Sequence, residues 1–72
     1  MRKSYEIEVD CAMCATLFEQ TVRKQEGVNA AVVNFMAQKI LIDFCEGADE
    51  REVIKRVAKA CRRAVPGSEL YK

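Results

Sequence analysis

The sequence predicts an α+β fold, a two-layer sandwich in which two helices cover one face of a four-stranded antiparallel sheet. Segments in which apolar residues alternate with polar ones, as in half-buried strands, are interrupted by two segments in which they recur every third or fourth position, as in helices. Read in order, these segments give β-α-β-β-α-β, the split βαβ arrangement. With 72 residues, the chain has room for a single domain, residues 1–72.

The first strand is expected at Lys3–Val9, where Tyr5, Ile7 and Val9 share one face. A short loop then leads into the first helix. Gly27 is expected to end this helix as its C-cap, because glycine readily adopts the left-handed backbone conformation found there. The face of this helix that is expected to point to the core is an apolar stripe with a polar edge, and it consists of Cys14, Leu17, Phe18, Thr21, Val22 and Gln25.

The next two strands are expected at Val28–Phe35 and Lys39–Phe44. Both segments are rich in β-branched or alternating apolar residues. Only Met36–Gln38 separates them, and so short a connection favours an antiparallel hairpin.

The second helix is expected to begin at Asp49, which with Glu52 has the spacing of a capping box. Pro66–Gly67 ends it, and Ser68–Tyr71 is expected to form a short last strand. The apolar stripe of this helix consists of Val53, Ile54, Val57, Ala58, Cys61 and Val65.

The composition excludes several classes of function. Twelve basic and eleven acidic residues give a net charge of +1, which argues against nucleic-acid binding. No stretch approaches the ~20 apolar residues of a membrane span. The charged N-terminus is not followed by the apolar run of a signal peptide. We therefore expect a cytoplasmic protein without a membrane span.

The four cysteines carry the strongest chemical signal. Cys11 and Cys14 form a C-x-x-C motif, but the second such motif of a four-thiolate zinc site is missing, and there is no histidine for a thiol–imidazole nucleophile. A helix N-terminus favours the thiolate, which is the form that binds metal. Two thiolates leave the coordination open, which suits capture and transfer of a soft or borderline ion.

The other sulfur-containing residues are expected to lie outside the site. Cys61 belongs to the core stripe, although its end of the helix faces the same rim as the thiol pair, and Cys45 is placed at the opposite rim. Met13 is expected to pack or to face solvent rather than coordinate. Met36 is expected to fill a gap in the core, with a flexible cover over the site as the alternative.

The segment Asp10–Ala15, together with Gly27, Val28, Lys39 and Val33–Phe35, resembles the heavy-metal-associated domain family. That family comprises small cytosolic metallochaperones and the N-terminal domains of soft-metal P-type ATPases. The resemblance implies a ferredoxin-like βαββαβ fold and a metal site at Cys11 and Cys14. It also implies a monomer that docks transiently to another metal-binding domain or to a metal-transporting ATPase, with no enzymatic activity of its own.

Two positions depart from the copper-binding members of this family. Those members usually carry methionine two residues before the first cysteine, where this chain has Val9. Asp10, directly before the first cysteine, resembles the members that handle zinc, cadmium or lead. A carboxylate ligand also suits a divalent ion better than Cu(I), for which two thiolate ligands are sufficient. We therefore expect Asp10 to be the third ligand of a Zn(II), Cd(II) or Pb(II) site. Cu(I) is the alternative ion, and N-capping of the first helix the alternative role of Asp10.

Two alternatives concern partners and chemistry. The second helix carries Arg51, Lys55, Arg56, Lys59, Arg62 and Arg63, which form either a solvated face or a docking surface for an acidic partner. If they form a docking surface, charge reversal at Lys59 and Arg62 is expected to slow metal transfer.

A strand followed by C-x-x-C and a helix is also the thioredoxin arrangement, so a thiol–disulfide redox protein is the alternative from another class. The chain is short for that fold, and its single proline, Pro66, precedes a terminal strand.

Overall fold

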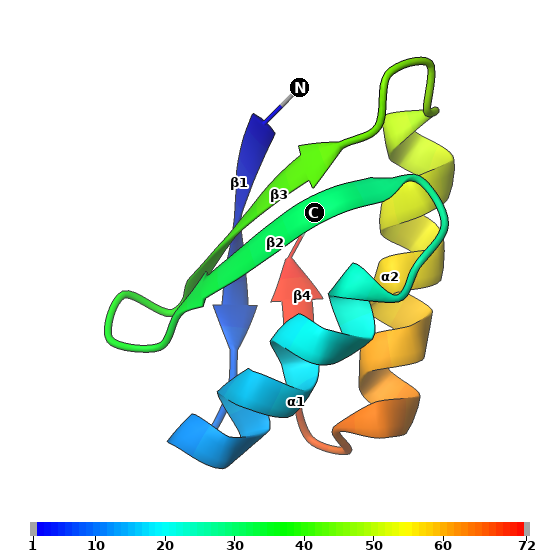
Figure 1. Cartoon of the computed structure of the whole chain (residues 1–72). Helices are drawn as coiled ribbons and strands as arrows, with labels where there is room; N and C mark the ends of the chain where they lie inside the picture. Colours follow the sequence, from blue (N-terminus) through cyan, green and yellow to red (C-terminus); the bar gives the residue numbers. More distant parts are fainter. Residues whose placement is uncertain (1, 72) are drawn as a thin grey trace.

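Two helices lie against one face of a four-stranded antiparallel sheet in the computed structural model, which describes residues 2–71 (Figure 1). The strands are arranged in the order β2-β3-β1-β4. This confirms the predicted fold, a two-layer βαββαβ sandwich. The elements are β1 (Arg2–Glu8), α1 (Ala12–Arg23), β2 (Val28–Asn34), β3 (Lys39–Phe44), α2 (Glu50–Ala64) and β4 (Glu69–Tyr71).

The strand register fixes which loops meet at each end of the sandwich. Strands β1 and β3 are antiparallel, with Arg2 opposite Asp43 and Glu6 opposite Lys39. The end of β1 therefore lies beside the β2–β3 hairpin, whereas Cys45, which follows β3, lies at the opposite end. The start of α1 and the end of α2 are also at the hairpin end (Figure 1). We call this the cysteine end.

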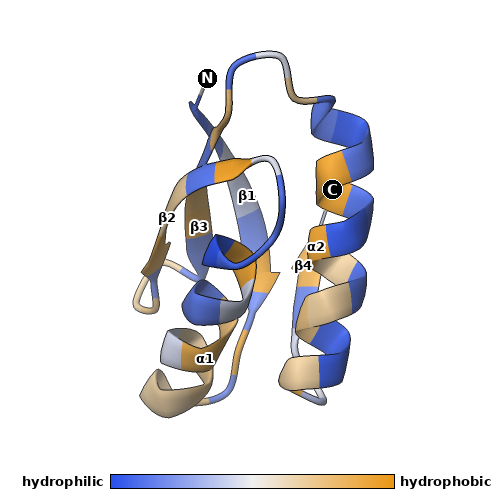
Figure 2. Cartoon of the chain, turned by 45° about the vertical axis from the view of Figure 1, so that its right-hand side comes forward, coloured by the Kyte–Doolittle hydropathy of each residue, from blue (hydrophilic) through white to orange (hydrophobic). Residues whose placement is uncertain are grey.

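The core between the sheet and the helices follows the predicted pattern throughout α2 and only in part in α1. All six residues of the predicted α2 stripe are buried, and the outer side of this helix is hydrophilic (Figure 2). In α1 the buried residues are Ala15, Phe18 and Val22, while Leu17 leaves 45% of its surface exposed. The assignment of Leu17 to the core is therefore wrong. Helix α1 is turned so that the small side chain of Ala15 faces the core instead.

Gly27 does not cap α1 as predicted. The helix ends at Arg23 with Lys24 as its C-cap in a right-handed conformation, and Gly27 stands between that end and β2 with φ +94°. A Cβ atom at Gly27 would lie 2.6 Å from Cγ2 of Val53 in α2. Glycine is therefore needed here both for its backbone conformation and for the close approach of α2.

The N-cap of α2 is the predicted residue, but its side chain accepts a different backbone N–H from the one that a capping box requires. Asp49 is the N-cap, and its side chain accepts from the backbone N–H of Arg51 at 3.1 Å rather than from that of Glu52. The cap is therefore not a capping box, although it satisfies one of the free N–H groups of the first turn.

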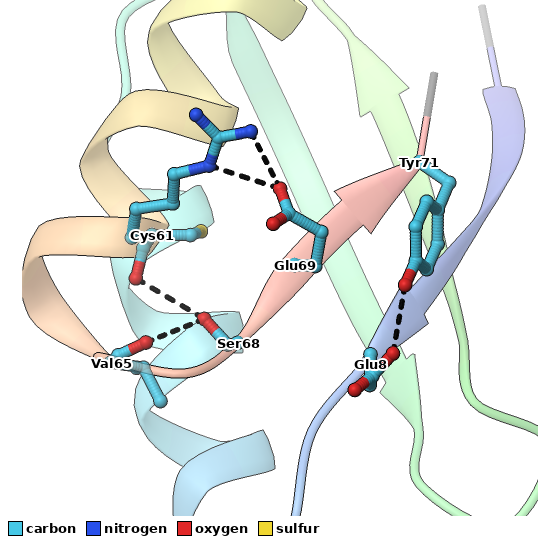
Figure 3. Close-up of polar contacts among 7 residues, drawn as sticks. Glu8, Cys61, Val65, Ser68, Glu69 and Tyr71 are labelled. Carbon is cyan, nitrogen blue, oxygen red and sulfur yellow. Dashed lines mark hydrogen bonds and ion pairs between the residues drawn. The ribbon is translucent and has the colours of Figure 1, made fainter.

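The short strand β4 is held in place by polar contacts with its neighbours (Figure 3). The buried hydroxyl of Ser68 donates to the carbonyl of Val65 at 2.7 Å, with the carbonyl of Cys61 at 3.3 Å. Arg62 donates to the Glu69 carboxylate through two nitrogens, at 2.9 and 2.7 Å. The hydroxyl of Tyr71 donates to Glu8 at 2.7 Å and ties β4 to β1.

The edge strand β2 is covered by two side chains of α1. Glu19 accepts the backbone N–H of Val33 at 2.8 Å, and Arg23 donates to the carbonyl of Ala31 at 3.1 Å. Unpaired backbone groups on an edge strand invite pairing with another chain. These side chains satisfy two of the groups that β2 presents.

Candidate metal centre

Cys11 stands at the junction of β1 and α1 and caps the helix. Its extended backbone (φ −148°, ψ 164°) places Sγ where it accepts the backbone N–H of Cys14 at 3.3 Å. The carbonyl of Cys11 accepts the N–H of Ala15 at 3.0 Å, which starts the helical hydrogen-bond series. The N-cap is therefore Cys11, and the alternative in which Asp10 caps the helix is wrong.

The thiols of Cys11 and Cys14 face each other at this helix N-terminus. Their sulfur atoms are 3.1 Å apart, neither forms a disulfide, and Cys11 is exposed while Cys14 is partly exposed. The hydrogen bond between the sulfurs, with the backbone N–H of Cys14, lowers the pKa of Cys11. The same sulfur contact, followed by desolvation, raises the pKa of Cys14. These contacts favour a Cys11 thiolate that accepts a hydrogen bond from the protonated thiol of Cys14.

Asp10 lies beside the pair but does not complete a three-ligand cluster. Its side chain is exposed, and its negative charge adds a little to the raised pKa of Cys14 and opposes, more weakly than the sulfur contact, the lowered pKa of Cys11. Within residues 2–71, no three side chains of Cys, Asp, Glu or His are grouped to hold a metal ion. The structure thus brings together Cys11 and Cys14, with Asp10 adjacent to them in the chain.

The remaining cysteines lie away from the thiol pair. Cys61 is 1% exposed in the core against Phe18, and burial raises the pKa of its thiol to about 12. A neutral, buried thiol is a packing residue rather than a ligand. Cys45 is exposed at the opposite end of the sandwich.

Sequence reasoning missed the exposure of Leu17 in α1 and of Met36 in the hairpin, whereas the exposure of Met13 agrees with the expectation that it packs or faces solvent. Met36 is 91% exposed and fills no gap in the core, so that prediction is wrong, and Met13 is 75% exposed. With Leu17, they are three large exposed apolar side chains on α1 and the hairpin. The stripe that placed Leu17 in the core was one of two adjacent faces that the same spacing allowed.

Gln38 of the hairpin was also missed as a neighbour of the site. Its side-chain Oε1 accepts the backbone N–H of Val9 at 2.9 Å, just before Asp10 and Cys11. The two residues are 29 positions apart, and no local pattern signals such a contact.

Helices that could cross a bilayer are absent from residues 2–71, because neither helix is long and apolar enough.

Several known proteins are similar to this chain. It is 31% identical over 58 residues to the heavy metal-associated isoprenylated plant protein 28 of Arabidopsis thaliana, an alignment that covers 81% of the chain and 35% of that protein. The chain thus spans about a third of that relative. The N-terminal domain of a potential copper-translocating P-type ATPase from Bacillus subtilis, solved in its Cu(I)-loaded state, is 28% identical with a TM-score of 0.70, and the match covers 96% of this chain and 81% of that one. The CopZ metallochaperone has a TM-score of 0.77 at 15% identity, over 99% and 100% of the two chains.

The family follows from the extent of the sequence match. The model of the heavy-metal-associated domain matches residues 4–63, which include most of β1, the cysteine pair and most of α2. The fold, the position of the C-x-x-C motif at the β1–α1 junction and this match agree. The chain belongs to the heavy-metal-associated domain family.

Proposed function

We propose that this chain is a non-enzymatic carrier domain that captures a heavy-metal ion with Cys11 and Cys14 and passes it to a partner. The observation that carries the proposal is the pair of free thiols, 3.1 Å apart, at an exposed helix N-terminus. The helix dipole and the N–H of Cys14 stabilise negative charge on Cys11. Two ligands leave coordination positions open for a third ligand from the partner. The ion can therefore pass to the partner through an intermediate in which both proteins bind it.

The ion that we propose is divalent, Zn(II), Cd(II) or Pb(II), with Asp10 as third ligand. Val9 stands where copper-binding members carry methionine, and the exposed Asp10 side chain precedes Cys11 directly. A carboxylate oxygen and its charge favour a divalent ion over Cu(I).

Cu(I) is the second candidate, and one observation favours it. In residues 2–71 no third donor is grouped with the two thiols, and two thiolates alone are a sufficient ligand set for Cu(I). Three of the similar solved domains are also named for copper, among them the Bacillus subtilis domain at 28% identity.

Metal competition tests the function and the ion together. The reduced protein is offered Zn(II), Cd(II), Pb(II) and Cu(I) and examined by native mass spectrometry. We expect one ion per chain, with a divalent ion outcompeting Cu(I) where glutathione sets the free Cu(I) concentration. Exclusive Cu(I) loading contradicts the proposed ion, and the absence of any bound ion contradicts the function.

Asp10→Ala is expected to change the affinities for Zn(II) and Cu(I) in different ways. Loss of a carboxylate ligand should weaken Zn(II) binding on the order of 10- to 100-fold. Cu(I) affinity should stay the same or rise slightly, because removing this charge lowers the pKa of both thiols and reduces proton competition. Both affinities are measured by chelator competition at constant pH. Asp10→Asn is the matched control for charge, since it retains an oxygen at this place. Unchanged zinc affinity in Asp10→Ala removes Asp10 from the site.

The outer side of α2 is the docking surface that we propose for an acidic partner domain. Arg56, Lys59 and Arg63 line a shallow groove beside the end of α1. Arg62 is different, because its guanidinium is bound to Glu69. Arg56 also has a partner, because it donates to the carbonyl of Glu26 at 3.2 Å. Among the described residues of the groove, the cations without such a contact are Lys59 and Arg63, and these suit docking best. Such a surface increases the rate at which charged partners meet.

Charge reversal in this groove is expected to slow metal transfer without weakening metal binding. In Lys59→Glu/Arg63→Glu the transfer rate to an acidic acceptor domain should fall ~10-fold or more at low ionic strength, and the difference should shrink as salt is added. Stopped-flow transfer to a fluorescent acceptor measures the rate. Arg2→Glu/Lys39→Glu on the open face of the sheet is the control with the same change in charge. Equal slowing in both variants shows that net charge, not this surface, controls transfer.

The thiol–disulfide alternative rests on the same sulfur contact. Two thiols 3.1 Å apart, one with a lowered pKa, have the arrangement that a dithiol redox centre needs. Disulfide reductase turnover, measured beside metal stoichiometry, distinguishes the two functions. Turnover together with weak metal binding favours the redox protein.

A further inference from the structure

Gln38 continues the hydrogen bonding of β1 beyond the point where β3 has turned away. The last residue of β3 opposite β1 is Lys39, which pairs with Glu6. The backbone carbonyl of Gln38 then accepts the N–H of Ile7 at 3.0 Å, and its side-chain Oε1 accepts the N–H of Val9 at 2.9 Å. The side chain thus replaces one backbone carbonyl of the missing strand and satisfies an N–H group beside the buried Val9 side chain.

The backbone conformation of Gln38 indicates that this position requires a side chain long enough to reach the N–H of Val9. Its φ is +53°, and it is the one non-glycine residue with positive φ in the described part of the chain. Glycine and asparagine adopt this region more easily than glutamine does. Asparagine is one methylene shorter and cannot reach Val9 from the same backbone. The amide is also fixed from its other side, because Nε2 donates to the carbonyl of Phe35 at 2.9 Å.

The contact holds one end of the segment that carries the site. This segment runs from Val9 through Asp10 to Cys11, and its other end is fixed by the helix cap, where Sγ of Cys11 accepts the N–H of Cys14. Between these two anchors stands only the exposed Asp10. The position of the Val9 amide therefore limits the paths by which Asp10 and Cys11 can present their ligand atoms.

We propose that Gln38 is a positioning residue of the metal centre, which fixes the Val9 amide and thereby the geometry of Asp10 and Cys11. This inference rests on the proposed metal-binding function and adds a residue to it. Groups that hold ligands in place without touching the ion commonly change metal affinity 10- to 100-fold when they are lost. Gln38 has the contacts of such a group, although it comes from a hairpin far away in the sequence.

Gln38→Asn tests this role, because it preserves a backbone that tolerates positive φ and shortens the side chain. We expect the Val9 amide to exchange hydrogen at least ~10-fold faster, while the Ile7 amide, which is bound to the backbone of residue 38, stays protected. Affinity for Zn(II) should fall ~10-fold. The thermal unfolding midpoint should stay close to that of the wild type, since asparagine relieves backbone strain.

Two controls separate positioning from general stability of the hairpin. Gln38→Glu keeps a side-chain oxygen that can accept the N–H of Val9 but loses the donor to the carbonyl of Phe35. If the Val9 contact is the one that positions the segment, this variant should lose less zinc affinity and less Val9 protection than Gln38→Asn. Asn34→Ala removes a different hydrogen bond of the same hairpin, the one that Asn34 Oδ1 accepts from the N–H of Ala37 at 3.0 Å. Asn34→Ala should leave metal affinity unchanged, because the hydrogen bond that it removes lies within the hairpin and does not involve β1.

The outcomes distinguish this inference from the proposed function. Wild-type affinity in Gln38→Asn, despite faster exchange at Val9, overturns the positioning role and leaves metal binding intact. An equal loss of affinity in Asn34→Ala also overturns it, since the hairpin as a whole would then be responsible. A wild-type protein that binds no metal ion overturns the proposed function and this inference with it.

Discussion

Cys11→Ser/Cys14→Ser is expected to abolish stoichiometric metal binding and to leave the fold intact. A serine hydroxyl is a poor ligand for a soft or borderline ion, so we expect affinity to fall at least ~10³-fold. Serine at position 11 caps a helix at least as well as the Cys11 thiol, which accepts a single N–H at 3.3 Å. Chelator competition and native mass spectrometry measure the binding, and circular dichroism follows thermal unfolding.

The matched control for this variant is Cys45→Ser. Cys45 is also an exposed free thiol, but it lies at the opposite end of the sandwich. Its replacement should leave one ion bound per chain with wild-type affinity. Metal that persists in the double variant, or is lost in Cys45→Ser, contradicts the assignment of the site.

The same pair predicts how binding depends on pH. A metal ion must displace the protons of its thiols, so affinity falls as pH falls. The contact between the sulfurs lowers the pKa of Cys11 and raises that of Cys14. Below the pKa of Cys14 one proton is displaced, and affinity should fall about tenfold per pH unit. Below that of Cys11 the fall should approach a hundredfold per unit. Affinity that does not change through this range contradicts a dithiolate site.

Gly27→Ala is the single substitution from which we expect the largest loss of stability. The new Cβ would lie 2.6 Å from Cγ2 of Val53, and the backbone at φ +94° disfavours any side chain. Overpacking of a core costs about 1–3 kcal/mol. The left-handed conformation costs alanine roughly 1–2 kcal/mol more. A loss of about 3 kcal/mol approaches the whole free energy of unfolding of a domain below about 80 residues.

Gly47→Ala separates the two causes. Gly47 also has a positive φ, +80°, but no atom lies within 4 Å of a Cβ placed there. This variant should show the backbone cost alone, so the difference between the two variants in urea unfolding measures the clash with Val53. Adding Val53→Ala to Gly27→Ala should recover part of the loss, because the two sites are in contact and their effects do not add. Equal losses at both glycines contradict the steric explanation.

Periodicity and spacing in the sequence determined the elements of this protein and the place of its thiol pair. All six residues of the predicted stripe are buried, five in α2 and Val65 directly after it, because a long amphipathic helix has a single apolar face. The C-x-x-C motif at the end of an alternating strand placed Cys11 and Cys14 at a helix start, where the structure has them. These features depend on neighbours in the chain, and the sequence displays such neighbours directly.

The tertiary structure decided the features that depend on contacts between distant segments. It turned α1 so that Ala15 rather than Leu17 is buried, since the packing against the sheet selects between two adjacent helix faces. It required glycine at position 27 because α2 approaches there. It also joined Gln38 to Val9 across 29 residues and bound Arg62 to Glu69, which removes one cation from the docking surface. No local pattern specifies such contacts, because they arise only when the sheet, the helices and the hairpin have assembled.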